Sequence, residues 1–221
     1  MTQDVLEQMP GLPARAFEKA DASPDTAFYR QPRFVAHIDE GAIAAVTDVY
    51  RDVLPAGGAV LDLMGSWISH FPAEVAYEAT GHGMNAAELR ANPRLDRVFV
   101  QDLNAQPVLP LEDASFDAVV VCVSVQYLQR PVEVFREVRR VLRAGGVFVV
   151  SFSNRCFPTK AVAIWQALSG GEQQELVAAY MERAGFAGIE GRAHTPRFSD
   201  PLWVVIGRVE AAGGVGLAVA D

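Results

Sequence analysis

One uninterrupted apolar run in the middle of the chain restricts the possible folds more than any other segment. It reads FDAVVVCVSVQYL, residues 116–128, and it opens with three consecutive valines after Ala118. Such a run is typical of a strand that is buried on both faces of a parallel sheet. The segments AVLDLM (59–64) and VFVVSFS (147–153) have the same character. The chain is therefore predicted to form a central, mostly parallel sheet.

Helical patterns alternate with these strands. GAIAAVTDVYRDVL (41–54) and PVEVFREVRRVL (131–142) repeat apolar residues at helical spacing, and Gly145-Gly146 is expected to close the second helix. We also predict short strands at 78–85 and 96–104, a helical turn between them, helices near 159–169 and 172–184, and two final strands at 185–195 and 201–210. Strands alternating with helices imply a three-layer α/β fold.

Polar residues follow several of the predicted strands at their carboxyl ends. They are Asp62, Asn85, Asp102, the segment 122–126 and the segment 153–156. In an open parallel sheet, ligands bind beyond the carboxyl ends of the strands, where the strand order reverses. We therefore expect these residues to converge on one ligand-binding crevice.

Composition excludes several classes of protein. The chain has 221 residues, half of them apolar, a formal net charge of −8 and no Lys/Arg-rich stretch, so nucleic acid and anionic membranes are not its expected partners. No signal-like N-terminus and no membrane-length apolar run is visible, and two cysteines form no disulfide framework. We expect a cytoplasmic protein with an N-terminal arm or lid (1–40), an α/β domain (41–210) and a flexible tail (211–221); its oligomeric state stays open.

The stretch 109–154, LPLEDASFDAVVVCVSVQYLQRPVEVFREVRRVLRAGGVFVVSFSN, resembles the class I S-adenosylmethionine-dependent methyltransferases, especially their small-molecule group. In that family an LPF-x-D-x-SFD segment leads into the fourth strand, and a helix and a VL-(K/R)-PGG turn precede the fifth. Here these parts read LPLED (109–113), SFD (115–117) and VLRAGG (141–146). The resemblance implies a Rossmann-like, seven-stranded sheet whose last strand is antiparallel, with S-adenosylmethionine as cofactor.

The first half departs from this family. The family's D-x-G-x-G-x-G motif, aligned from Asp62, places Met64, Ser66 and Ile68 at the three glycine positions, with Gly65 one place off. The family also has an acid for the ribose hydroxyls after the second strand, and here Met84-Asn85 stands instead. Asn85 is the nearest substitute. Glu78 and Glu88 are further candidates for this role, although their spacing is expected to put them out of register. The resemblance assigns cofactor contacts to Asp62, Met64, Gly65, Ser66, Met84, Asn85, Asp102, Leu103 and Ser124, with Asp102 on the adenine amino group.

Several of these residues also have an ordinary structural explanation. Asp62 and the 64–66 turn would be a plain β-to-α turn with a capping acid. Asn85 is a favourable helix N-cap, and Asp102 is typical of an Asx-turn. Gln126 is expected near the ligand with Ser124, or is ordinary polarity at a strand end. Cys122 is expected to be a core thiol. A metal or redox pair of Cys122 with Cys156 has little support, because no other ligand accompanies them.

Candidate catalytic residues come from less specific signals. His37, His70 and Tyr29 are candidate general bases, and Arg155 in the segment 151–161 could hold an anionic substrate group together with Lys160. The ordinary alternatives are surface packing for Tyr29 and His37, and helix capping with solvated charge for the segment 151–161. His70 and His82 are isolated histidines, which are more often structural than catalytic. The first hypothesis is methyl transfer to a small-molecule acceptor. The alternatives are lyase- or isomerase-like chemistry with the same fold and cofactor, and a non-catalytic binding or scaffold protein.

Overall fold

A computed structural model describes residues 9–211, so the predicted flexible tail lies almost entirely outside the described residues. Within that range the strands are β1 (Ala59–Asp62), β2 (Glu78–Gly83), β3 (Arg97–Val100), β4 (Phe116–Cys122), β5 (Leu142–Phe152), β6 (Ala187–His194) and β7 (Leu202–Arg208). The helices are α2 (Asp25–Phe28), α3 (Glu40–Val53), α4 (Ala86–Ala91), α5 (Pro131–Val141), α6 (Ala163–Ala167) and α7 (Gly170–Ala184), with a 3-10 turn, η1, at Val125–Tyr127.

The strands form one seven-stranded sheet in the order β3-β2-β1-β4-β5-β7-β6. Neighbouring strands from β3 through β5 are parallel, and β7 is antiparallel to both β5 and β6. This confirms the predicted fold class, including its antiparallel last strand. The strand order reverses between β1 and β4, which is the switch point where ligands bind in such sheets.

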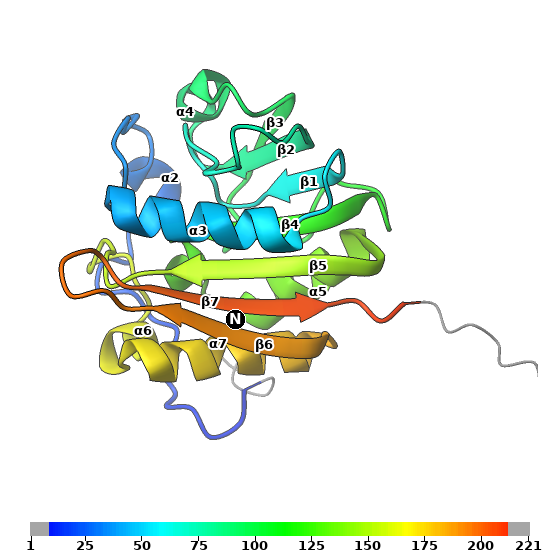
Figure 1. Cartoon of the computed structure of the whole chain (residues 1–221). Coiled ribbons are helices and arrows are strands. Elements are labelled where there is room, and N and C mark those ends of the chain that lie inside the picture. The colour runs from blue at the N-terminus through cyan, green and yellow to red at the C-terminus, as the bar shows by residue number, and fades with distance from the viewer. Residues whose placement is uncertain (1–8, 212–221) are drawn as a thin grey trace, which may run out of the picture.

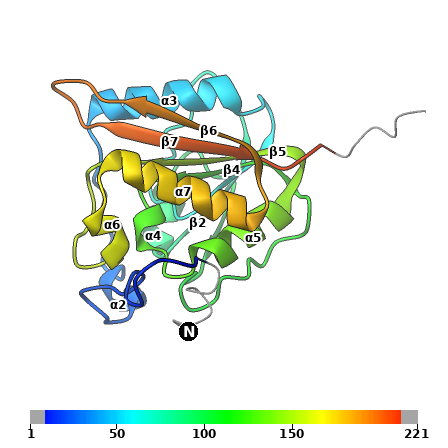
Figure 2. The ribbon, with the colours of Figure 1, turned by 90° about the horizontal axis from the view of Figure 1, so that it is seen from below.

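Helices cover the sheet on two faces (Figures 1 and 2). α3 lies on one face, where Val46 and Tyr50 pack against alternate residues of β1 and β4 such as Val60 and Val120. α5 and α7 lie on the other face, where Phe135 and Tyr180 are within the larger core cluster. The buried valines of β4 thus face two helical layers, as their apolar run predicts.

β4 ends at Cys122, where the polar segment was expected to follow it, because Val123 has a φ of +51° and the chain then enters η1. Several other boundaries were predicted wrongly. β3 ends at Val100, before the acid at 102. Gly145-Gly146 does not close α5: that helix ends at Val141, and β5 begins at once with Leu142 paired to Phe116. The predicted helix 159–169 shrinks to Ala163–Ala167.

The connection between β1 and β2 departs most from a regular α/β crossover. Parallel neighbours are usually joined through a helix, but residues 63–77 contain no helix. Arg94 holds this loop in place by donating to the carbonyl oxygens of Phe71, Pro72 and Val75. The side chain of Phe71 is buried in the core on the α3 face. The loop therefore covers the sheet where a helix is usual.

Candidate functional site

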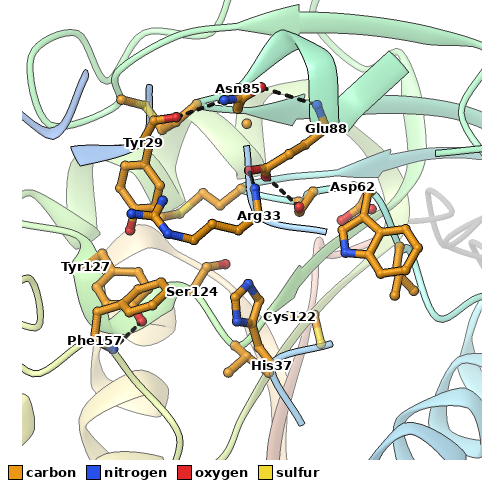
Figure 3. A pocket seen from close by; sticks show the side chains of 18 of the residues that line it. Tyr29, Arg33, His37, Asp62, Asn85, Glu88, Cys122, Ser124, Tyr127 and Phe157 are labelled. Atoms are coloured by element: carbon orange, nitrogen blue, oxygen red, sulfur yellow. Dashed lines mark hydrogen bonds between the residues drawn. The ribbon is translucent and has the colours of Figure 1, made fainter. Parts of the chain in front are cut away.

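A cavity of about 550 Å³ lies beyond the carboxyl ends of β1, β2 and β4. This volume is in the range of small-molecule sites. The arm, the loop after β1, α4, the turn after β3 and the segments after β4 and β5 all contribute to its walls (Figure 3). All thirteen residues predicted for the site line it: Tyr29, His37, Asp62, Met64, Gly65, Ser66, His70, Met84, Asn85, Asp102, Leu103, Ser124 and Arg155. The predicted convergence at one crevice is confirmed, while the individual roles of these residues stay predictions.

Asp62 anchors the turn that replaces the glycine motif. Its side chain is buried, and burial raises its pKa to about 6, although a hydrogen bond donated by the Ser69 hydroxyl at 2.6 Å opposes this shift. A Cβ at position 65 would lie 2.7 Å from the Asp62 carboxylate. Gly65 is therefore required here because a side chain would collide with Asp62.

His82 on β2 holds the same turn from the other side. Its Nδ1 accepts from the backbone N–H of Met64 at 3.1 Å, and its Nε2 lies 3.0 Å from the carbonyl oxygen of Gln101. The carbonyl of His82 also accepts from the backbone N–H of Gly65 at 2.7 Å. Burial lowers the pKa of His82 to about 4, so the neutral ring donates from Nε2 and accepts at Nδ1. These bonds fix Met64 at a φ of +60°, a conformation that costs free energy for a residue other than glycine.

The end of β2 has no room for an acidic side chain. A Cβ at Gly83 would lie 2.4 Å from the carbonyl oxygen of Gly65, so the turn after β1 occupies that space. Asn85 is the N-cap of α4, because its Oδ1 accepts from the backbone N–H groups of Ala87 and Glu88. Its Nδ2 donates to the carbonyl oxygens of Tyr29 and Arg30 in the arm. The structural explanation of Asn85 is thus confirmed, and its amide is already engaged by protein groups.

Glu88 is one of the two acids whose spacing was expected to put them out of register. It lies in the first turn of α4, is 9% exposed and lines the cavity. Its Oε2 accepts from the Ser66 hydroxyl at 2.6 Å, and its Oε1 accepts from the backbone N–H of Arg33 at 2.7 Å (Figure 3). The signal that could have found it is a pair of residues: Ser66 stands where the family has a glycine, and Glu88 lies three residues after the N-cap Asn85.

Asp102 forms the Asx-turn that was its ordinary explanation. Oδ1 accepts from the backbone N–H groups of Asn104 and Ala105, at 2.9 and 3.3 Å. Among the described residues, no group donates to Oδ2, so this oxygen can accept a hydrogen bond from a ligand. Leu103 is buried beside it and contributes an apolar wall.

The segment after β4 contains strained and unsatisfied groups. Val123, a β-branched residue at positive φ, lines the cavity, and so does Ser124, whose buried hydroxyl has no partner among the described residues. Gln126 is buried and donates to the carbonyl of Val123, but it does not line the cavity. The expectation that Gln126 lies at the ligand is therefore wrong, because η1 turns its side chain into the protein.

The three candidate bases differ in their protonation. Burial raises the pKa of the Tyr29 hydroxyl far above its ordinary value, which disfavours the phenolate. Burial and the neighbouring His37 lower the pKa of His70 to about 4, and loss of surrounding water lowers the pKa of His37. Both histidines are therefore neutral at pH 7 and able to accept a proton, whereas Tyr29 is suited to donate a hydrogen bond.

The two cations in the segment 151–161 lie in different surroundings. Arg155 lines the cavity, is mostly exposed and approaches Asp200 only at 4.0 Å. Lys160 is fully buried, 3.1 Å from Asp21 and 3.3 Å from Asp25, and donates to the carbonyl oxygen of Ser23. The expectation that Lys160 holds a substrate anion is wrong, because its ammonium group binds the arm.

Trp67 and Phe157 line the cavity and contact residues of the arm. Trp67 donates from its indole N–H to the carbonyl oxygen of Val35 and packs edge-on against Phe34. Arg33 packs over the ring of Phe28 at 4.5 Å and also faces Phe157. Trp67 thus joins the loop after β1 to the arm at the cavity. The sequence does not reveal this contact, because the two segments are more than 30 residues apart.

Both cysteines also line the cavity, and both are free. Burial raises the pKa of Cys122 to about 12, consistent with the expected core thiol. The residues that the structure describes contain no cluster of His, Cys, Asp and Glu able to hold a metal ion. Within the same range, no helix is long and apolar enough to cross a bilayer.

Comparison with known protein families gives one match, to a methyltransferase domain over residues 63–150. Among curated proteins, the biotin biosynthesis bifunctional protein BioHC of Teredinibacter turnerae is 27% identical over 146 residues, which are 62% of this chain and 26% of that protein. The chain thus matches about a quarter of the length of this curated relative.

Solved structures with the same fold are more distant in sequence. A methyltransferase of Thermotoga maritima, a possible histamine N-methyltransferase, has a TM-score of 0.58 at 16% identity, over 76% of this chain and 90% of that one. The [4+2]-cyclase SpnF has a TM-score of 0.60 at 17% identity, over 85% and 91%. Phosphoethanolamine N-methyltransferase 2 of Haemonchus contortus, solved with S-adenosylmethionine, has 0.57 at 15% identity, over 77% and 53%.

Proposed function

Since this chain belongs to the class I S-adenosylmethionine-dependent methyltransferase family, we propose that it transfers a methyl group from S-adenosylmethionine to a small-molecule acceptor. The observation that carries the proposal is the cavity at the switch point of the sheet, where Asp62 at the end of β1 and Asp102 after β3 line the same space as residues of the arm. When bound, the cofactor supplies an activated methyl group, so the protein has mainly to bind, orient and exclude water.

The residues of the cavity fit this cofactor. The close approach of Gly65 to Asp62 brings the backbone of the 64–66 turn to the cavity wall, where the methionine end would rest. The free Oδ2 of Asp102 would accept from the adenine amino group, and Leu103 would pack against the ring. Met84 and Ser124 lie in the same cavity and would complete the contacts.

The opposite side of the cavity would hold the acceptor. Trp67, bonded to the carbonyl of Val35, would help to exclude water from the cavity, and the phenol of Tyr29 would donate a hydrogen bond to an acceptor oxygen. His37 or His70 would take the proton that leaves the attacking atom. Arg155, with its exposed guanidinium, would attract an acidic group on the acceptor.

Titration calorimetry with S-adenosylmethionine and S-adenosylhomocysteine tests the proposal. We expect saturable binding of both ligands, and accumulation of S-adenosylhomocysteine when a suitable acceptor is added. Failure of both ligands to bind at millimolar concentration would sink the proposal and favour a binding or scaffold protein. Binding with turnover of the acceptor, but without S-adenosylhomocysteine, would favour non-methylating chemistry.

The two free cysteines support a cytoplasmic setting, where thiols stay reduced.

A further inference from the structure

The loss of the family's ribose acid raises the question of which group replaces it in this chain. The end of β2 cannot supply an acid, because a side chain at Gly83 would collide with the carbonyl oxygen of Gly65. Asn85 is also committed, since its amide both caps α4 and donates to two carbonyl oxygens of the arm. A replacement must come from a residue whose acceptor atoms reach the cavity from another position.

Glu88 meets this requirement. It lines the cavity, and its two carboxylate oxygens each accept a single hydrogen bond from the protein, one from Ser66 and one from the N–H of Arg33. Each oxygen has two lone pairs, so each can accept a second bond. The two existing bonds fix the carboxylate without using up its capacity as an acceptor.

The sheet order places Glu88 at the right point along the cofactor. α4 follows β2, and β2 lies between β1 and β3. The 64–66 turn follows β1 and would hold the methionine end, while Asp102 follows β3 and would hold the adenine end. The ribose joins these two halves of the cofactor, so the group over β2 is the one that would meet it.

We propose that Glu88, held by Ser66 and by the backbone of Arg33, accepts hydrogen bonds from the ribose hydroxyls in place of an acid at the end of β2. This assignment rests on the proposed function. It also links two departures from the family: the serine at a lost glycine position positions the carboxylate that compensates for the lost acid.

The test compares S-adenosylhomocysteine with its 2′-deoxy analogue on the wild type, Glu88→Gln and the control Glu78→Gln. Glu78 is an exposed glutamate at the opposite end of β2. We expect Glu88→Gln to weaken S-adenosylhomocysteine binding by roughly 10- to 100-fold, as for loss of a charged hydrogen-bond acceptor. The wild type and Glu78→Gln should prefer the ribonucleoside by about 10-fold, and Glu88→Gln by less than about 2-fold.

The ratio of the two affinities within one variant does not depend on how well that variant folds. An unchanged ratio in Glu88→Gln would overturn the assignment, as would a ratio that collapses in Asn85→Ala and persists in Glu88→Gln. If the wild type binds neither ligand, the proposed function itself fails. If the wild type binds both ligands and Glu88→Gln keeps the wild-type ratio of affinities, the ribose assignment fails alone.

Discussion

His82 is a single residue that determines the shape of the candidate cofactor site. It accepts from Met64 and lies within hydrogen-bond distance of the carbonyl of Gln101, so it joins the turn after β1 to the turn after β3. The sequence offered His82 only as an isolated histidine, which is more often structural than catalytic. The structure supports a positioning role, since both ring nitrogens are engaged by backbone groups.

The lowered pKa of His82 has a consequence for stability. The unfolded chain binds a proton near the ordinary histidine pKa of about 6.5, whereas folded His82 binds it only near 4. Because the unfolded state takes up more protons between these values, the stabilisation from neutral His82 declines as the pH falls through this window. We expect His82→Gln to cost roughly 1–3 kcal/mol of unfolding free energy at pH 7 and less at pH 5, measured by urea denaturation.

Nitrogen-15 spectra of the imidazole test the same point independently. We expect one neutral tautomer, protonated at Nε2, to persist in folded His82 at pH 5, while histidines of the urea-unfolded chain are protonated. A charged His82 ring in the folded protein at pH 5 would show that its two backbone contacts are not those described above.

Asp62 has the opposite effect on the pH dependence of stability. Its pKa is raised to about 6, so its contribution to the free energy of unfolding increases as the pH falls through this window. The difference in unfolding free energy between His82→Gln and the wild type therefore reports on His82 more directly than the pH dependence of wild-type stability alone.

Asp102 gives a second prediction at the scale of one residue. Asp102→Ala removes the free Oδ2 and is expected to weaken S-adenosylhomocysteine binding by roughly 1–3 kcal/mol, as measured by calorimetry. The substitution also removes the Asx-turn bonds, so Asp102→Asn is the matched variant, because its Oδ1 can keep those bonds. Full affinity in both variants would show that the adenine end lies elsewhere.

The loop 63–77 is the element that the sequence predicted least well. Pro72 disfavours a regular helix in this segment, but no local pattern indicates that Arg94, about 20 residues further on, would satisfy the loop's carbonyl groups. By contrast, α3, α5, β4 and β5 were predictable because each buries a regular apolar pattern. Regular periodicity determines strands and helices locally, whereas this loop depends on contacts between residues distant in sequence.

Arg94→Ala should therefore loosen the loop. Three carbonyl oxygens lose a charged donor, and we expect a loss of about 2–3 kcal/mol in unfolding free energy. Hydrogen exchange should accelerate within residues 63–77 more than in β4 or β5. Arg90→Ala, an exposed position on α4, is the control. Equal exchange in both variants would mean that Arg94 does not support the loop.

At the scale of the whole molecule, the arm is a part of the core. Ala16 and Phe17 are buried in the cluster on the α5 and α7 face, and Lys160 binds Asp21 and Asp25 from beneath. The sequence indicated an irregular arm that would close over the site, and the predicted arm residues Tyr29 and His37 do line the cavity. Its attachment could not be predicted, because a lysine in a polar loop is more often exposed than buried.

Lys160→Met should weaken the attachment of the arm to the rest of the protein. Removing the buried ammonium leaves Lys19 as the one cationic partner of the Asp25 carboxylate within residues 9–211, at an expected cost of about 3 kcal/mol in unfolding free energy. Limited proteolysis should then cut within residues 9–38 faster than in the wild type. Arg155→Met, a mostly exposed cation of the same segment, should leave both measurements unchanged. Equal behaviour of the two variants would contradict a structural role for Lys160.

The most direct test of the central claim is the electron density of crystals grown with S-adenosylhomocysteine. We predict the ligand within the cavity at the sheet switch point, with its methionyl end on the 64–66 turn, its ribose at Glu88 and its adenine beside Asp102. Density for the ligand outside this cavity, or in the reverse orientation within it, would contradict the account.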